Sequence, residues 1–303
     1  QGEAAVDQLR FLDAQDLLGR DVVPPMRDFV EHDVRSRVVL VTGAGGSIGS
    51  ELARQAYRER ARKLILLDHS ELALYEVERD LYALGYSSST EVVPLLGSVL
   101  DADRLFRIMS DYKVETVYHA AAYKHVPMVE RNIVAGIKNN VLGTWYAAQA
   151  AAQADVESFV LVSSDKAVRP TSVMGASKRV AELAVQALAK VHSRTRFSIV
   201  RFGNVLSSSG SVVPLFREQI ARGGPVTVTH RDVIRYFMTI PEAAQLVIQA
   251  GAQGRHAEVF VLDMGEPVSI FELAQKMIRL AGQTPVIDGE KVHNGIQVEV
   301  QGL

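Results

Sequence analysis

Short apolar runs alternate with longer amphipathic stretches along most of this 303-residue chain. Each apolar run is four to six residues long, which is typical of a strand buried on both faces of a parallel sheet. The alternation predicts an α/β fold in which a doubly wound parallel sheet is covered by helices. The predicted strands are Val38–Thr42, Leu64–Leu67, Val92–Leu96, Thr116–His119, Phe159–Val162, Phe197–Phe202 and Val259–Leu262.

The stretches between these runs have helical periodicity. Helices are predicted at about 47–58, 71–84, 129–154, 174–192, 241–251 and 269–281, with a further one beginning at 212–214. Residues 1–34 contain Pro24-Pro25 and show no sustained period, so they predict an irregular lead-in segment with one strand and one short helix.

A glycine-rich turn follows the first predicted strand and opens the first predicted helix. Its sequence is Gly-Ala-Gly-Gly-Ser-Ile-Gly, and its first, fourth and last residues have the spacing G-x-x-G-x-x-G. Small residues permit a tight turn and let the backbone approach a pyrophosphate, whose charge lies against the free N–H groups of the helix. Between a strand and a helix, this motif predicts a dinucleotide site of Rossmann type. The expected contacts are Gly43, Gly46, Ser47, Ile48 and Gly49.

Asp68 follows the second predicted strand, nineteen positions after Gly49. An acidic residue at this spacing hydrogen-bonds the adenosine ribose, and its charge would repel a 2′-phosphate, so NAD is favoured over NADP. The alternative is a helix cap, because Asp68 and Ser70 both precede a predicted helix. After the fourth strand, Ala120 and Ala121 are small enough for the cofactor to pass close to the backbone.

Ser163, Ser164, Asp165 and Lys166 emerge at the carboxyl end of the run Phe159–Val162, where open α/β sheets bind ligands. Met174 and Lys178 follow on the next predicted helix. These residues resemble extended short-chain dehydrogenase/reductases over residues 35–303, and most closely the nucleotide-sugar 4,6-dehydratases. Met174 stands where those enzymes have tyrosine. The same replacement is known in the large, membrane-anchored bacterial branch that acts on UDP-N-acetylglucosamine in polysaccharide and protein-glycan synthesis.

The resemblance implies an NAD-dependent reaction and a role for each of these residues. Lys166 would remove the carbon 5 proton, which requires its ammonium to be made neutral by burial or by a neighbouring positive charge. Asp165 would act on the carbon 4 and carbon 6 hydroxyls, and Ser164 would bind the carbon 4 oxygen. Lys178 would hold the nicotinamide ribose, and Met174 cannot carry a proton.

The resemblance also divides the chain into an NAD-binding domain at 35–203 and a smaller substrate-binding lobe at 204–303, with elements that return to the larger domain. The expected substrate contacts are Lys124, Asn204, Val213 and Arg235. A loop lysine is often solvated and a surface arginine often belongs to an ion pair, so Lys124 and Arg235 have these alternatives. Asn140 matches the family's structural asparagine and is expected to orient backbone groups.

Composition limits the possible partners. The 33 basic and 35 acidic residues nearly cancel without a long cluster of like charge, which argues against nucleic acid. There are no cysteines, and His119 and His125 lack the spacing of a helical metal pair, so no metal is expected. No apolar run approaches the ~20 residues that span a bilayer, so the chain as given is predicted to be soluble.

The resemblance adds expectations about assembly and location. In the resembled branch, membrane helices precede this domain, which places the full-length protein at the cytoplasmic face of the bacterial inner membrane. The helix at 129–154 and the one after Met174 imply a homodimer or larger homo-oligomer. Two other functions remain open at this point: a nucleotide-sugar 4-epimerase on the same scaffold, and an NAD-sensing protein without catalysis.

Overall fold

A computed structural model describes residues 32–85, 90–255, 257–287 and 294–302. The described chain divides into two compact units. The larger unit holds residues 32–202 and 241–262, and the smaller holds 203–240 and 263–302. The strand and short helix predicted within residues 1–34 fall almost entirely outside the described residues.

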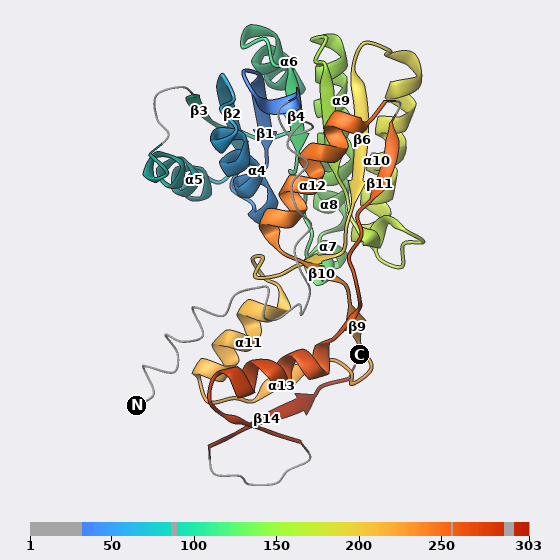
Figure 1. Ribbon diagram of the computed structural model, residues 1–303. Helices are drawn as coiled ribbons and strands as arrows, with labels where there is room; N and C mark the ends of the chain where they lie inside the picture. Colours follow the sequence, from blue (N-terminus) through green and yellow to red (C-terminus); the bar gives the residue numbers. More distant parts are fainter. Residues whose placement is uncertain (1–31, 86–89, 256, 288–293, 303) are drawn as a thin grey trace. The chain divides into compact units, whose positions relative to one another are not determined.

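The larger unit is built on a seven-stranded sheet in the order β11-β6-β5-β4-β1-β2-β3. All neighbouring strands are parallel, which confirms the predicted doubly wound sheet of Rossmann type (Figure 1). From β1 the chain runs outward through β2 and β3, and β4 then begins the other half beside β1. The strands are β1 Val38–Thr42, β2 Lys63–Asp68, β3 Glu91–Leu96, β4 Thr116–His119, β5 Ser158–Val162, β6 Arg196–Arg201 and β11 Glu258–Val261.

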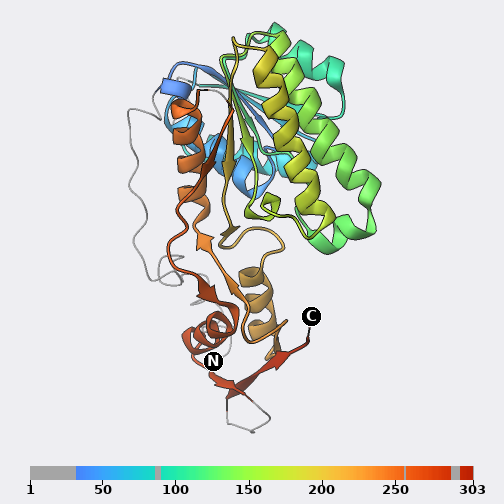
Figure 2. The ribbon, with the colours of Figure 1, turned by 90° about the vertical axis from the view of Figure 1, so that its right-hand side faces the viewer.

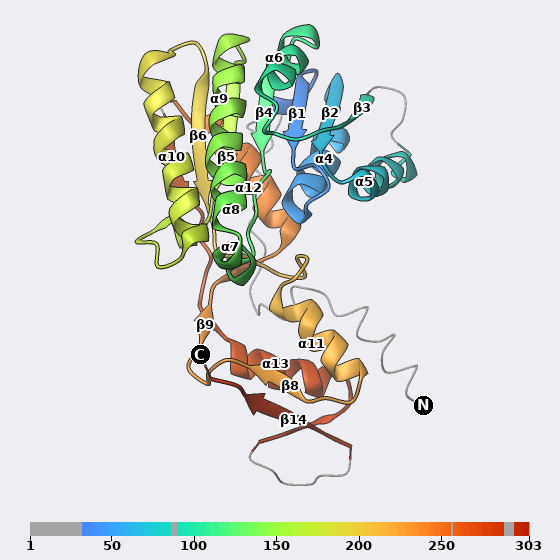
Figure 3. The same cartoon turned by 180° about the vertical axis from the view of Figure 1, so that it is seen from behind.

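Helices cover both faces of this sheet. Helices α4 (Ser47–Arg58) and α12 (Ile240–Gln253) lie on the face toward the viewer in Figure 1. Helices α6 (Ala102–Asp111), α9 (Gly143–Gln153) and α10 (Val173–Val191) cover the opposite face, as Figures 2 and 3 show. Helix α5 (Glu71–Ala83) packs against β2 and β3. The apolar alternation is explained by this arrangement, because the central strands are buried between two helix layers.

The predicted helix at 129–154 is helical in the structure but is interrupted at Asn132 and contains a π-helical turn. The structure has α7 (Val126–Arg131), α8 (Ile133–Ile137), a π-helical turn (Lys138–Leu142) and α9 in its place. Asn132 separates α7 from α8 because its backbone leaves the helical region at φ −132° and ψ 52°. Single π turns inside helices often occur at functional sites, and this one contains Asn140.

The prediction of a buried strand at 259–262 is wrong. Strand β11 pairs with β6 and forms the outer edge of the sheet. Val261, at its end, is 73% exposed. An apolar run of four residues does not distinguish a central strand from an edge strand, because both carry β-branched and aromatic residues.

The smaller unit has its own core, formed where α11 (Val212–Ala221) and α13 (Ile270–Leu280) pack beside a parallel sheet of order β13-β14-β8. Those strands are β8 Val226–Val228, β13 Thr284–Val286 and β14 Gly295–Val300. Two short pairs complete it: β7 (Asn204–Val205) with β10 (Phe237–Met238), and β9 (Ile234–Arg235) with β12 (Val268–Ser269). In the part of the chain that the structure describes, no helix is long and apolar enough to cross a bilayer.

Candidate active site

The glycine-rich turn joins β1 to α4 with almost no space for side chains. Gly43 has a φ of +67°, and a Cβ atom there would lie 2.6 Å from the Ala121 backbone nitrogen. A Cβ on Gly49 would lie 2.0 Å from the Gly43 carbonyl oxygen. Helix α4 begins after Gly46, and no side chain caps it. The N–H groups of its first turn therefore point out of the helix start, where a ligand could accept from them. The turn therefore has the close packing and the helix start without a side-chain cap that suit a pyrophosphate site.

Asp68 ends β2 and is only 7% exposed. One carboxylate oxygen accepts the Gly45 N–H at 2.8 Å, and the other accepts the Ser70 N–H at 2.9 Å. Helix α5 is capped by Ser70, whose hydroxyl accepts from Ala73, so Asp68 is not the cap. The oxygen that accepts from Ser70 also lies 3.4 Å from His69 Nδ1, whereas the oxygen that accepts from Gly45 keeps a second lone pair for a further donor.

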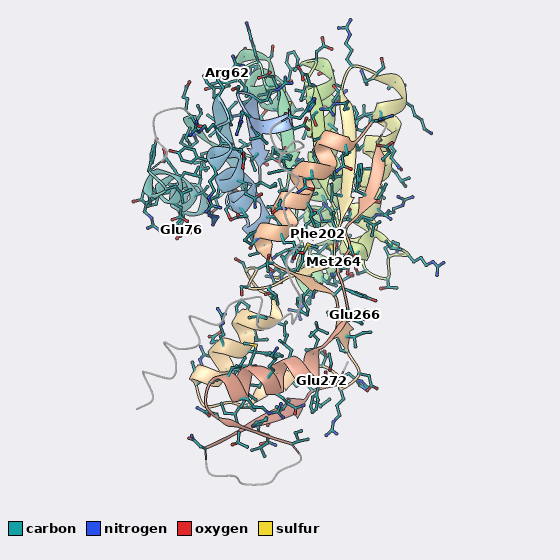
Figure 4. All side chains as sticks on the ribbon, in the orientation of Figure 1. Arg62, Glu76, Phe202, Met264, Glu266 and Glu272 are labelled. Atoms are coloured by element: carbon teal, nitrogen blue, oxygen red, sulfur yellow. The ribbon has the colours of Figure 1, made fainter. Side chains whose placement is uncertain are left out.

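Ser164, Asp165 and Lys166 form a compact hydrogen-bonded cluster directly after β5. Residues Asp165–Ala167 make a single 3₁₀ turn, and Ser164 caps it by accepting the Lys166 N–H. The Asp165 Oδ1 atom accepts from the Ser164 hydroxyl and from the Lys166 ammonium, both at 2.9 Å. The Asp165 N–H donates to the Phe202 carbonyl at 3.0 Å, which ties this turn to the end of β6. Phe202 is labelled in Figure 4 near the carboxyl end of the sheet, opposite Arg62 at the amino end.

Lys166 is not buried enough for burial to make its amine neutral. Its side chain is 38% exposed and is paired with Asp165, which is 44% exposed. A second positively charged residue, Lys124, lies near Lys166. Partial burial and then the Lys166 charge lower the pKa of Lys124. The two ammonium groups therefore lie close enough to repel each other.

Helix α10 presents Met174 and Lys178 to the interior, at 2% and 5% exposure. A Cβ on Gly175 would lie 2.3 Å from the Lys166 carbonyl oxygen, so the Asp165–Ala167 turn rests directly on the first turn of this helix. The Lys178 ammonium donates to the Val162 carbonyl at 2.6 Å. Burial lowers the pKa of Lys178 to about 8, although the Glu182 carboxylate acts in the opposite direction.

His119, at the end of β4, bridges the glycine turn and the α9 helix. Its Nδ1 lies 2.8 Å from the Thr42 hydroxyl, and its Nε2 lies 3.1 Å from the Thr144 hydroxyl. Thr144 donates its proton to the Asn140 carbonyl, so it must accept from Nε2–H, and Nδ1 must then accept from Thr42. Burial, and secondarily the Lys178 charge, lowers the pKa of His119 to about 3, so the ring is neutral with its proton on Nε2.

The lowered pKa of His119 predicts how the free energy of unfolding depends on pH. An unfolded histidine takes up a proton below about pH 6.5, whereas folded His119 does not until about pH 3, so its contribution to stability is lost as pH falls through that window. Between pH 7 and pH 5 the loss is about 2 kcal/mol. In urea unfolding, His119→Gln should lose correspondingly less stability over this interval than the unchanged protein. The control is His230→Gln, whose imidazole is 51% exposed. Equal pH dependence in all three proteins would contradict this assignment.

Asn140 is fully buried and fixes the loop that contains Lys124. Its amide accepts the Tyr123 N–H at 2.8 Å and donates to the Tyr123 carbonyl at 2.9 Å. It also donates to the Ser177 hydroxyl, which in turn donates to the Met174 carbonyl at 2.7 Å. The prediction that Asn140 orients backbone groups is confirmed.

The family model described as "Polysaccharide biosynthesis protein" matches residues 39–303. The chain belongs to this family. The capsular polysaccharide biosynthesis protein CapD of Staphylococcus aureus is 49% identical over 282 residues, which cover 93% of this chain and 47% of that protein. The chain thus spans about half the length of that relative. A UDP-N-acetylglucosamine 4,6-dehydratase (inverting) of Campylobacter jejuni is 30% identical over 227 residues, covering 74% of this chain and 66% of that enzyme.

Solved structures show the same fold. The X-ray structure of Pen from Bacillus thuringiensis matches with a TM-score of 0.78 at 30% identity, covering 89% of this chain and 78% of that one. A double mutant of the dTDP-glucose 4,6-dehydratase DesIV of Streptomyces venezuelae, solved with NAD and DAU bound, matches with a TM-score of 0.72 at 23% identity, covering 86% of this chain and 88% of that one. Members of this fold therefore place their dinucleotide-binding sheet as this chain does.

The expected substrate contacts fall in both units. Lys124 belongs to the larger unit and lies in an exposed loop. Asn204 and Arg235 belong to the smaller unit, where Arg235 is exposed and donates to the Ile234 carbonyl. Val213 is fully buried in the core of the smaller unit, so its side chain packs with that core and only its backbone could meet a ligand.

Sequence reasoning missed Glu182, a carboxylate on α10 with no exposed surface. It accepts hydrogen bonds from Ser163, Arg179 and Arg201. The spacing offered a sign, because Glu182 follows Lys178 by four residues and Met174 by eight, which places all three on one face of the helix. A carboxylate on a buried face requires a cationic partner.

Proposed function

We propose that this chain is the catalytic part of an NAD-dependent nucleotide-sugar 4,6-dehydratase that converts UDP-N-acetylglucosamine to a 4-keto-6-deoxy sugar nucleotide. The observation that carries the proposal is the Ser164–Asp165–Lys166 cluster, in which a carboxylate and an amine meet at the carboxyl end of β5. The dehydratase name of the 30% identical Campylobacter relative supports the same activity. An acid and a base side by side are what removal of water from adjacent carbons needs.

The residues around β1 fit NAD. The turn from Gly43 to Gly49 leaves no room for a Cβ at Gly43 or Gly49, and its helix start offers N–H donors for two phosphates. Asp68 is proposed to accept both ribose hydroxyls, and Ala120 and Ala121 leave the neighbouring backbone open. Lys178 is proposed to bind the nicotinamide ribose. NAD bound there would accept a hydride from carbon 4 of the sugar and return it to carbon 6.

The chain's own groups would move the protons. Asp165 takes the proton of the carbon 4 hydroxyl as carbon 4 becomes a ketone, and Ser164 donates a hydrogen bond to that oxygen. The ketone acidifies carbon 5, whose proton goes to the neutral amine of Lys166. Asp165 gives its proton to the carbon 6 hydroxyl, which leaves as water. Lys166 finally returns a proton to carbon 5, so both residues end in their starting states.

Met174 explains why Asp165 must act twice. A thioether cannot accept the carbon 4 proton, and Met174 is buried at 2% exposure in the α10 helix. The Asp165–Lys166 pair at 2.9 Å supplies the nearest base on the described catalytic turn. Lys124 lies near Lys166, since the Lys166 charge contributes to the lowered pKa of Lys124, so a second cation stands beside the proposed base.

The same scaffold could support 4-epimerisation, which needs only oxidation and return of hydride to carbon 4. Met174 argues against this alternative, because an epimerase of this kind depends on the tyrosine. A dinucleotide sensor without catalysis would need none of the four residues Ser164, Asp165, Lys166 and Lys178. The dehydratase is therefore the proposal that uses every polar group of the cluster.

Incubation with UDP-N-acetylglucosamine in deuterated water tests this proposal. NMR should show a product with a carbon 6 methyl group, a carbon 4 ketone and one deuterium at carbon 5. A 4-epimer without label at carbon 5 would support the epimerase instead. Binding of NAD without any product from the sugar nucleotide would support the sensor.

Assembly and location also belong to the proposal. Helix α10 exposes Val180 and Leu183 at 47% and 48%, and α8 exposes Val134 and Ile137 at 67% and 43%. Such apolar side chains on neighbouring helices fit a homodimer face. We also propose that the full-length protein works at the cytoplasmic face of a bacterial inner membrane and that Asn204 and Arg235 contact the substrate diphosphate.

A further inference from the structure

The buried carboxylate of Glu182 accepts four hydrogen bonds. Its Oε1 accepts from the Ser163 hydroxyl at 2.6 Å and from Arg201 Nε at 2.8 Å. Its Oε2 accepts from Arg201 Nη2 at 2.5 Å and from Arg179 Nη1 at 3.0 Å. Burial would raise the pKa of Glu182, but the hydrogen bonds from Arg201, Ser163 and Arg179 outweigh it and lower that pKa. The carboxylate is therefore ionised inside the protein.

These contacts reach the catalytic turn from two strands. Ser163 is the residue directly before Ser164, at the end of β5. Arg201 is the last residue of β6, directly before Phe202, whose carbonyl accepts the Asp165 N–H. The Glu182 carboxylate on α10 is therefore hydrogen-bonded to residues at the ends of both β5 and β6. The Asp165–Ala167 turn lies beside these two strand ends.

Glu182 also acts on Lys178, which lies one helical turn earlier on the same face of α10. Burial is the largest influence on the pKa of Lys178 and lowers it, whereas the Glu182 carboxylate raises that pKa and so favours the ammonium form. The other ionisable group that interacts with Lys178 is His119, which is neutral. Arg201 and Arg179 form ion pairs with the Glu182 carboxylate and partly offset its negative charge.

We propose that Glu182 is a positioning residue of this site: its carboxylate fastens the ends of β5 and β6 to α10, and its charge keeps Lys178 an ammonium. Both actions come from a single buried group. The first rests on the four hydrogen bonds and is independent of the reaction. The consequence for catalysis rests on the proposed function, in which an ammonium at Lys178 holds the nicotinamide ribose.

The charge effect is measured without turnover. In protein labelled with ¹³C at the lysine ε carbons, the Lys178 resonance, assigned by its absence in Lys178→Arg, should titrate with a midpoint near pH 8. In Glu182→Gln the midpoint should fall by about 1 unit, because the attractive charge is gone. The control Glu130→Gln removes an exposed carboxylate that accepts the Val173 N–H at the start of the same helix. It should leave the midpoint within about 0.2 unit.

A second variant covers the case in which Glu182→Gln does not fold because Arg201 is left buried without its partner. The double variant Glu182→Gln with Arg201→Gln removes both charges and keeps two amides that can hydrogen-bond each other. Its Lys178 midpoint should lie about half a unit below that of the unchanged protein, because the Arg201 charge that partly balanced Glu182 is removed as well. A Lys178 midpoint near pH 8 in whichever of these variants folds overturns the proposal.

Turnover separates this inference from the proposed function. If the protein is the dehydratase, the alkaline limb of kcat against pH should move downward in Glu182→Gln by the same interval as the Lys178 midpoint. A fall in kcat with the limb unmoved means that Glu182 is only a structural residue, which also overturns the charge assignment. A protein without dehydratase activity contradicts the proposed function, and the NMR midpoints still decide the role of Glu182.

Discussion

Asp165→Asn is expected to lower kcat with UDP-N-acetylglucosamine by about 1000-fold, the effect of removing a group that acts as both base and acid. The amide has the same shape, and its oxygen can still accept from the Ser164 hydroxyl, which lies 2.9 Å from Asp165 Oδ1. The ability to take and give a proton is lost, together with the negative charge that pairs with the Lys166 ammonium. Steady-state kinetics should therefore show the loss in kcat, with little change in the Kd of NAD.

The matched control for this substitution is Asp155→Asn. Asp155 is an exposed aspartate that pairs with Arg194 at 3.0 Å. Its backbone has a φ of +52°, which asparagine adopts readily, so the variant should fold and keep full activity. If Asp165→Asn kept kcat within about 3-fold of the unchanged protein, Asp165 could not be the acid and base of the reaction.

Gly49→Ala is expected to have the second largest effect, a loss of about 3 kcal/mol in the free energy of unfolding together with loss of NAD binding. The added Cβ would lie 2.0 Å from the Gly43 carbonyl oxygen and 2.8 Å from its carbon, both of which belong to the backbone. Helix α4 would have to move away from β1, and the N–H groups at its start would move with it. Thermal unfolding and NAD titration measure the two effects.

Gly46→Ala is the comparison in the same turn. Its added Cβ would meet only the Gly43 oxygen, at 3.3 Å, and Gly46 has a φ of −75° that alanine tolerates. Its stability should change by less than about 1 kcal/mol. Equal destabilisation by the two substitutions would show that close helix–strand packing at Gly49 is not what this turn requires.

The parts of the fold that depend on local sequence could be predicted. The glycine spacing and the apolar run before it placed β1 and α4, since a tight turn and a buried strand each leave a local pattern. The polar residues after the predicted strand Phe159–Val162 also indicated the proposed site at Ser164, Asp165 and Lys166, because open α/β sheets bind ligands at the carboxyl ends of their strands. These features need no knowledge of distant parts of the chain.

The features that depend on tertiary contacts could not be predicted in this way. The π turn contains Asn140, whose side chain binds the Tyr123 backbone and Ser177, which lie 17 and 37 positions away in sequence. The exposure of Lys166 follows from how the 3₁₀ turn lies on α10, and periodicity carries no information about that. Glu182 needed its partners on β5 and β6 to be recognised as part of the site.

The central claim is that the Asp165–Lys166 pair removes water from a sugar oxidised at carbon 4, although methionine replaces the tyrosine. The most direct test uses UDP-N-acetylglucosamine with deuterium at carbon 4 in ordinary water. We predict that deuterium appears on the carbon 6 methyl group of the product, carried there within one active site. Deuterium that stays at carbon 4, in starting sugar or its epimer, would contradict the account.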